Sequence, residues 1–114
     1  DSARRAQLKT HVSTIKHEFD VREIPLPSPP SQIIPLVTGR AEQTLEAGTV
    51  LRNQGIYAVP IRYPTVPRGQ GRLRISLRSD HTEEDLVGLM DGIDELDRRD
   101  LLKRTAPWEA EQSG

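Results

Sequence analysis

The nine prolines of this chain constrain most strongly where it can be helical. Four of them fall within residues 24–32, at Pro25, Pro27, Pro29 and Pro30. Proline fixes φ, lacks an N–H group and restricts the residue before it, so a helix is excluded from this stretch. We therefore expect residues 24–32 to form an extended connector between a helix before it and a compact domain after it.

Two segments outside the connector have the apolar spacing of amphipathic helices. They are residues 3–19 and residues 82–97. The apolar side chains are Leu8, Val12, Ile15 and Phe19 in the first, and Leu86, Leu89, Met90, Ile93 and Leu96 in the second. Thr82 is the predicted N-cap of the second helix, because the acidic residues that follow it suit a helix N-terminus.

Residues 41–54 are predicted to form a further helix. Its expected buried face consists of Ala41, Leu45, Gly48 and Leu51. Gly55 suits the left-handed residue that ends many helices, and Ile56 suits the apolar contact that accompanies it. Glycine weakens a helix, so we expect close packing to explain Gly48, Gly88 and Gly92.

Three short segments predict strands, at residues 33–37, 57–61 and 72–77. Pro35 removes one hydrogen-bond donor from the first, which favours an edge strand. The connection between the last two is too short for a crossover helix, so they should pair antiparallel. The expected fold class is α/β, a two-layer α+β arrangement of a small, largely antiparallel sheet with helices packed on one face.

Composition excludes several classes of function. Without cysteine, the chain can form no disulfide, thiolate zinc site or cysteine nucleophile. A net charge of -1 and 4% aromatic residues argue against nucleic acid as a partner. His11, His17 and His81 are scattered without metal-ligand spacing, so we expect no metal site. The apolar runs are too short to span a membrane, and we expect no membrane partner.

Arginine is the informative residue type, because residues 62–78 contain five arginines and no acid. Within the last predicted strand, Arg72 and Arg74 alternate with apolar residues and so lie on the face away from the core. An arginine held on a strand can grip a carboxylate through two parallel hydrogen bonds. From the residues alone, a basic strand face that aids solubility is the simpler interpretation.

Several stretches, in order, resemble one family. They are SQIIPLVTG at 31–39, QGI at 54–56, PTVPRGQGRLRISL at 64–77 and HTEED at 81–85. Together they are similar to the C-terminal small domain of the α-oxoamine synthases, which are pyridoxal-phosphate (PLP) enzymes of aminotransferase fold type I. The resemblance covers about residues 3–97. It implies the fold of that domain and a decarboxylative condensation of an amino acid with an acyl-CoA, giving an aminoketone, CoA and CO2.

The stretch from residue 61 to residue 70 is similar to two branches of this family. Its IR followed by PTVP most resembles amino-oxononanoate synthase, which condenses L-alanine with pimeloyl-CoA in biotin synthesis. Its YP and PRGQ also resemble the glycine C-acetyltransferase branch, which is the alternative. The best expectation is therefore L-alanine and pimeloyl-CoA.

The resemblance also implies roles for individual residues. Arg74 occupies the position that grips the carboxylate of the amino acid bound to PLP, and Thr65 lies on a loop beside the active-site entrance. Arg72 has no such role and is expected to be a surface charge. None of the three lysines lies in a matching PLP motif, so we expect no catalytic and no cofactor-binding residue in this chain.

We accordingly expect four parts: residues 1–23 as a helix leading from a missing large domain, 24–32 as the connector, 33–104 as the small α/β domain and 105–114 as a polar tail. The partners would be the chain's own large PLP domain, an amino acid, an acyl-CoA and a second copy in a homodimer, in the cytoplasm. Two alternatives of another class are a non-catalytic anion-binding module and a purely structural domain.

Overall fold

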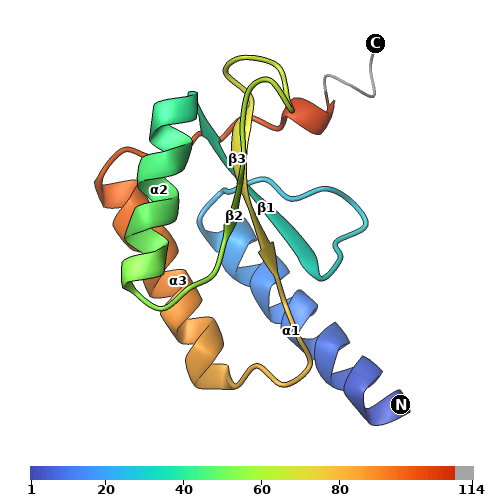
Figure 1. Cartoon of the computed structure of the whole chain (residues 1–114). Helices are drawn as coiled ribbons and strands as arrows, with labels where there is room; N and C mark the ends of the chain where they lie inside the picture. Colours follow the sequence, from blue (N-terminus) through green and yellow to red (C-terminus); the bar gives the residue numbers. More distant parts are fainter. Residues whose placement is uncertain (110–114) are drawn as a thin grey trace.

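The computed structural model describes residues 1–109, with three helices and three strands around one core (Figure 1). The helices are α1 (Ser2–Val21), α2 (Ala41–Asn53) and α3 (Glu83–Arg98), and the strands are β1 (Ile33–Gly39), β2 (Val59–Ile61) and β3 (Gly71–Ser76). Residues 22–32 contain neither helix nor strand, as the prolines predict. This connector is not detached, because Ile24 is buried in the core.

The sheet has the strand order β1-β3-β2, and both pairs are antiparallel. The predicted small antiparallel sheet is therefore confirmed, with β1 as an edge strand. Leu36 pairs with Leu73 and Ile34 with Ile75, and all four side chains are buried. The second strand is shorter than predicted, because it begins only at Val59.

The helices form the second layer. α2 lies on the sheet and contacts all three strands, α3 packs against α2, and α1 packs against α3 (Figure 1). The apolar stripe predicted for residues 82–97 is buried along its whole length. In α1 the C-terminal half carries the buried residues Ile15 and Phe19, whereas Leu8 is only partly buried.

The helix ends have the predicted chemistry. Gly55 adopts φ +80 and its N–H donates to the carbonyl of Arg52 at 2.9 Å, while the N–H of Ile56 donates to the carbonyl of Leu51 at 2.9 Å. This is the paired hydrogen-bond pattern of a glycine-terminated helix. At the start of α3, Thr82 and Asp85 each accept the backbone N–H of the other, which forms a capping box.

The buried face of α2 differs from the prediction. Leu45 is 45% exposed, whereas Thr44 is fully buried. Thr44 is accommodated because its hydroxyl is hydrogen-bonded to the hydroxyl of Thr38 at 2.6 Å and donates to the carbonyl of Arg40 at 3.0 Å. A polar residue with its hydrogen bonds satisfied thus takes the position that apolar spacing alone assigns to leucine.

Close packing explains only one of the three helix glycines fully. A Cβ at Gly92 would lie 2.8 Å from Cδ1 of Ile56 and 2.9 Å from Cδ2 of Leu51. At Gly48 the nearest contact would be an ordinary 3.5 Å to Leu73. At Gly88 a Cβ would meet nothing within 4 Å, so the close-packing prediction is wrong there.

The chain after α3 returns along the sheet. The N–H of Lys103 donates to the carbonyl of Val37 at 2.9 Å, beside β1. Residues 107–109 form a helical turn in which Pro107 is buried. The remainder of the predicted polar tail, residues 110–114, lies outside the described residues. Within residues 1–109 no helix is long and apolar enough to cross a membrane.

Candidate functional site

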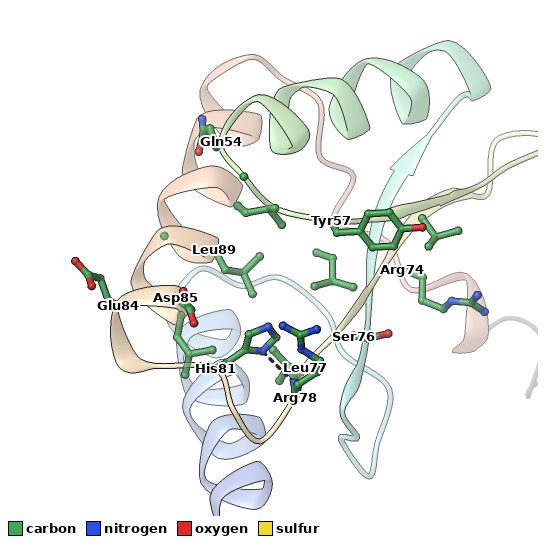
Figure 2. Close-up of a pocket in the computed structure, with 16 residues that line it drawn as sticks. Gln54, Tyr57, Arg74, Ser76, Leu77, Arg78, His81, Glu84, Asp85 and Leu89 are labelled. Atoms are coloured by element: carbon green, nitrogen blue, oxygen red, sulfur yellow. Dashed lines mark hydrogen bonds between the residues drawn. The ribbon is translucent and has the colours of Figure 1, made fainter.

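Arg74 lies in the middle of β3, on the sheet face opposite α2. Its register partners are Pro35 in β1 and Val59 in β2, while its neighbours Leu73 and Ile75 are buried on the helix side. Figure 2 shows its guanidinium extending away from the helices. The side chain is exposed and makes no hydrogen bond or ion pair with any residue from 1 to 109. A central strand thus presents a guanidinium with free N–H groups.

Arg72, two positions earlier on the same face, is not the surface charge that we expected. Its side chain is half-buried, and Nε donates to the backbone carbonyl of Gln70 at 3.2 Å. Its Nη2 is enclosed and has no partner among the described residues. The register places Arg72 between Val37 and Ile61, and Val37 is only 2% exposed. Strand alternation could not predict this burial, because it does not show that Arg72 has a paired strand on each side.

Thr65 lies on the loop between β2 and β3. It is exposed, and its N–H donates to the carbonyl of Arg62 at 2.9 Å in a turn. On the same loop the guanidinium of Arg68 lies 4.4 Å from the centre of the Tyr63 ring. No hydrogen bond joins Thr65 to Arg74 among residues 1–109, and Thr65 does not line the cavity that Arg74 lines.

The described residues do not fit PLP by themselves. PLP chemistry needs a lysine that forms an imine and a group that pairs with the pyridine nitrogen. Lys9 and Lys16 lie on α1, where Lys16 pairs with Asp20 at 2.6 Å. Lys103 follows α3, and its ammonium donates to the carbonyl of Gly69 at 3.4 Å. None of the three is on the strand that carries Arg74, and no step through PLP is assigned to this chain.

The histidines have structural surroundings. His11 is 2% exposed on the buried side of α1, with Nε2 3.4 Å from the side-chain nitrogen of Gln7. His81 accepts the backbone N–H of Arg78 through Nδ1 at 2.9 Å, the loop role expected from its place before Thr82. Among residues 1–109 no three histidine or acidic side chains gather as a metal site.

A cavity of about 490 Å³ lies between the β2 side of β3 and the N-terminal half of α3 (Figure 2). Its apolar lining comes from Ile56, Val59, Ile75, Leu77, Leu86 and Leu89, and its polar lining includes Arg74 as well as Tyr57, Arg78, His81 and Glu84. Sequence reasoning did not predict this cavity. Its signals in the sequence are Arg74 and the unexplained glycine at Gly88, which both line it.

The clearest shifts in pKa lie away from Arg74, where α1 meets α3. Arg22 donates to Asp94 at 2.7 and 3.1 Å and to Glu18 at 2.8 Å. These hydrogen bonds raise the pKa of Arg22 and lower the pKa of Asp94. Arg104 lowers the pKa of Asp97 in the same way. These groups hold α1 and the chain end against α3, which is a structural role.

Comparison with known proteins decides the family. Residues 2–93 match the family described as aminotransferase class I and II. The chain belongs to this family. It is 39% identical over 87 residues to 8-amino-7-oxononanoate synthase of Haemophilus ducreyi, which covers 76% of this chain. It is also 39% identical over 112 residues, 97% of its length, to mitochondrial 5-aminolevulinate synthase of Neurospora crassa.

Solved structures agree on the fold of this aminotransferase-family chain. Serine palmitoyltransferase of Sphingomonas wittichii superposes with a TM-score of 0.75 over 86% of the chain at 22% identity. The 8-amino-7-oxononanoate synthase of Francisella tularensis gives 0.70 over 83% at 23% identity. The relatives above confirm the resemblance to the α-oxoamine synthases, and the solved structures confirm the fold. The chain spans only about a fifth of the length of these relatives, with 22% of the Haemophilus protein and 18% of the Neurospora protein covered.

Proposed function

We propose that this chain is the C-terminal domain of a PLP-dependent acyl-CoA:amino acid C-acyltransferase. The parent enzyme would condense an amino acid with an acyl-CoA and release CO2 and CoA. Within it, Arg74 would bind the carboxylate of the amino acid, and Thr65 would line the entrance to the site. The observation that carries this proposal is the free guanidinium of Arg74 on a central strand, facing away from the core.

The chemistry of Arg74 supports this role. A planar guanidinium binds a carboxylate through two parallel hydrogen bonds and so fixes its orientation as well as its position. A strand holds the side chain better than a loop would, and orientation of the reacting bond is a large part of catalysis. In residues 1–109 no carboxylate competes for Arg74, whereas six other arginines have acidic partners. These are Arg22, Arg40, Arg78, Arg98, Arg99 and Arg104.

PLP would be held by a large domain of the parent enzyme, outside these 114 residues. The lysines described above do not suit it, while solved structures that share the fold contain PLP by their printed names. When bound, PLP would supply the electron sink for bond cleavage at the amino acid's Cα. This chain's part is to hold the substrate carboxylate. The 114-residue chain alone should therefore form no borohydride-reducible imine with PLP.

The test is amino-acid affinity in the full-length enzyme, for the variants Arg74→Ala, Arg74→Lys and Arg52→Ala. Losing a partner of a desolvated charge typically costs about 2–5 kcal/mol, so Arg74→Ala should raise Kd on the order of 30-fold to several thousand-fold. Arg74→Lys keeps the positive charge but loses the planar guanidinium that makes two parallel hydrogen bonds, so its affinity for the amino acid should also be lower than wild type. Arg52 is exposed on α2, and its replacement is the control. Wild-type affinity in Arg74→Ala would overturn the assignment.

The substrates are proposed as L-alanine and pimeloyl-CoA, in biotin synthesis, with a glycine C-acetyltransferase type as the alternative. The relatives carry the names of both 8-amino-7-oxononanoate synthase and 5-aminolevulinate synthase, so similarity alone favours no single branch. A product assay with alanine, glycine and serine against a series of acyl-CoAs separates them. The homodimer stays a prediction. The cytoplasmic location also stays a prediction, because the printed name of the Neurospora relative places that protein in mitochondria.

A further inference from the structure

β3 is fully paired on one side and only partly paired on the other. On the β1 side its pairing extends from Gly71 to Ser76, and the N–H of Leu77 continues it with a 2.8 Å hydrogen bond to Gln32. On the β2 side pairing covers only residues 72–74. Beyond Arg74, the edge of β3 that faces β2 therefore has no neighbouring strand within residues 1–109.

The register shows which backbone groups face this open edge. Because Leu77 donates its N–H to the carbonyl of Gln32, just before β1, alternation turns the N–H and C=O of Ser76 toward the β2 side. Neither group has a backbone partner among the described residues. The next group on this side, the N–H of Arg78, is already taken by Nδ1 of His81. Ser76 thus offers one donor and one acceptor, the complement of a peptide group.

The residue that would continue β2 opposite Ser76 has turned away. Continuing the Val59–Arg74 register by two positions places Tyr57 there, but Tyr57 is unpaired and 83% exposed. The cavity of about 490 Å³ described above occupies this position. Its lining includes Ser76 and the apolar side chains of Ile75 and Leu77 on either side of Ser76 in the sequence.

Gly88 completes this site on the α3 side. Gly88 and Gly92 are one helical turn apart and so lie on the same face of α3. At Gly92 the missing side chain makes room for Ile56 and Leu51. Gly88 also lines the cavity and also lacks a side chain. In contrast to Gly92, no atom of the described chain lies within 4 Å of where its Cβ would be.

We propose that the open edge of β3 at Ser76 binds an extended segment of the parent polypeptide. Its backbone would pair with Ser76, and an aliphatic side chain would pack against Gly88 as Ile56 packs against Gly92. An edge strand with free backbone groups is a template for adding a strand. The occupant is assigned to the same polypeptide because most of the length of this chain's relatives lies outside the matched segment. This inference rests on the proposed function only in requiring the longer polypeptide.

The test is backbone hydrogen exchange at single-residue resolution in the full-length enzyme. Leu77 is the internal control, because its N–H bonds to Gln32 within this chain. We expect the Ser76 amide to be protected at least about 100-fold relative to an unstructured amide. Free exchange of Ser76 while Leu77 stays protected would overturn the proposal. If protection of the Ser76 amide instead rises with protein concentration, a second copy of the chain occupies the edge, and the proposal is also overturned.

A pair of variants tests the packing at Gly88. Gly88→Leu fills the cavity and should return Ser76 to rapid exchange with Leu77 still protected. Val87→Leu, at a 59% exposed position on the same helix, should leave Ser76 protected. Unchanged protection of Ser76 in Gly88→Leu would contradict the proposal. Because Arg74 lines the same cavity as Gly88, the carboxylate role is tested separately, by amino-acid affinity in Arg74→Ala with Gly88 unchanged, so the two proposals fail separately.

Discussion

Gly71 begins β3 where two strands and α2 come together. A Cβ at this residue would lie 2.7 Å from the carbonyl oxygen of Gly39 and in closer contact still with the hydroxyl of Thr44. Thr44 cannot retreat freely, because its hydroxyl is hydrogen-bonded to Thr38 at 2.6 Å. The absence of a side chain at Gly71 therefore allows β1, β3 and α2 to meet.

The Gly71→Ala variant should destabilise the chain. Overpacking of a filled site typically costs about 1–3 kcal/mol, and here backbone as well as a side chain obstructs the methyl group. The free energy of unfolding, measured by urea denaturation, should fall by that amount. Gly69→Ala is a useful comparison, because a Cβ at Gly69 would meet nothing within 4 Å. Any loss of stability in Gly69→Ala should therefore come only from the positive φ of +80. A neutral Gly71→Ala would contradict this packing.

At the scale of the helices, α2 begins with a residue poorly suited to its position. Arg40 is the N-cap, with φ -76 and ψ 152, and its side chain caps no backbone N–H. It pairs instead with Glu42 at 2.6 Å, where both side chains are exposed. A cation at a helix N-terminus interacts unfavourably with the helix dipole, and an exposed ion pair adds little to the free energy of unfolding.

Arg40→Asp should therefore stabilise the chain by about 1 kcal/mol, because aspartate caps the helix and has the favourable charge. The measurement is the midpoint of urea denaturation at neutral pH. Arg40→Ala removes the unfavourable cation without adding a cap and should gain less. A loss of stability in Arg40→Asp would show that the Arg40–Glu42 pair contributes more than its exposure implies.

Two glycines of α3 should respond oppositely to the same change. Gly92→Ala would press against Ile56 and Leu51 and should lower the free energy of unfolding by about 1–3 kcal/mol. Gly88→Ala enters open space in the 114-residue chain and should raise it by about 1 kcal/mol through helix propensity. Thermal denaturation of the two variants side by side checks the difference. Equal effects would mean that Gly92 is not packed as described.

Sequence patterns predicted elements well where the pattern encodes a face. The alternation of Leu73 and Ile75 with arginines correctly predicted which side of β3 is buried. Sequence patterns failed where the burial of a residue depends on partners distant in the sequence. Thr44 replaces Leu45 in the core because Thr38 satisfies its hydroxyl, and Arg72 is covered by neighbours from other strands. The free guanidinium of Arg74 is likewise visible only once every possible acidic partner has been placed.

At the scale of the whole molecule, ion pairs hold α1 against the domain. Arg22 and Asp94 are 23% and 39% exposed, and their two hydrogen bonds join the end of α1 to α3. Because Arg22 lowers the pKa of Asp94, the folded state binds a proton there less readily than the unfolded chain does. The stabilisation is therefore complete above the ordinary aspartate pKa of about 3.9 and is lost as pH falls below it.

Asp94→Asn should lower the free energy of unfolding by about 0.5–1 kcal/mol at pH 7, a modest value because the pair is partly exposed. Urea denaturation repeated down to pH 3 should show the difference from wild type shrinking as Asp94 becomes protonated. Asp91→Asn is the matched control, because Asp91 is exposed in the middle of α3 and makes no ion pair in the described part of the chain, so its loss should matter little. A difference that grows toward low pH would contradict the assignment.

The strand order β1-β3-β2 also sets the order of assembly as the chain is synthesised. β2 and β3 are neighbours in the sequence and form a hairpin. β1 is synthesised first, and its pairing partner β3 follows only after α2 and β2. Closing that long loop is entropically costly, so the apolar side chains of Ile34 and Leu36 stay uncovered during the delay. Pro35 sits between them and gives β1 one donor fewer, which makes the nascent strand a poorer template for a neighbouring chain.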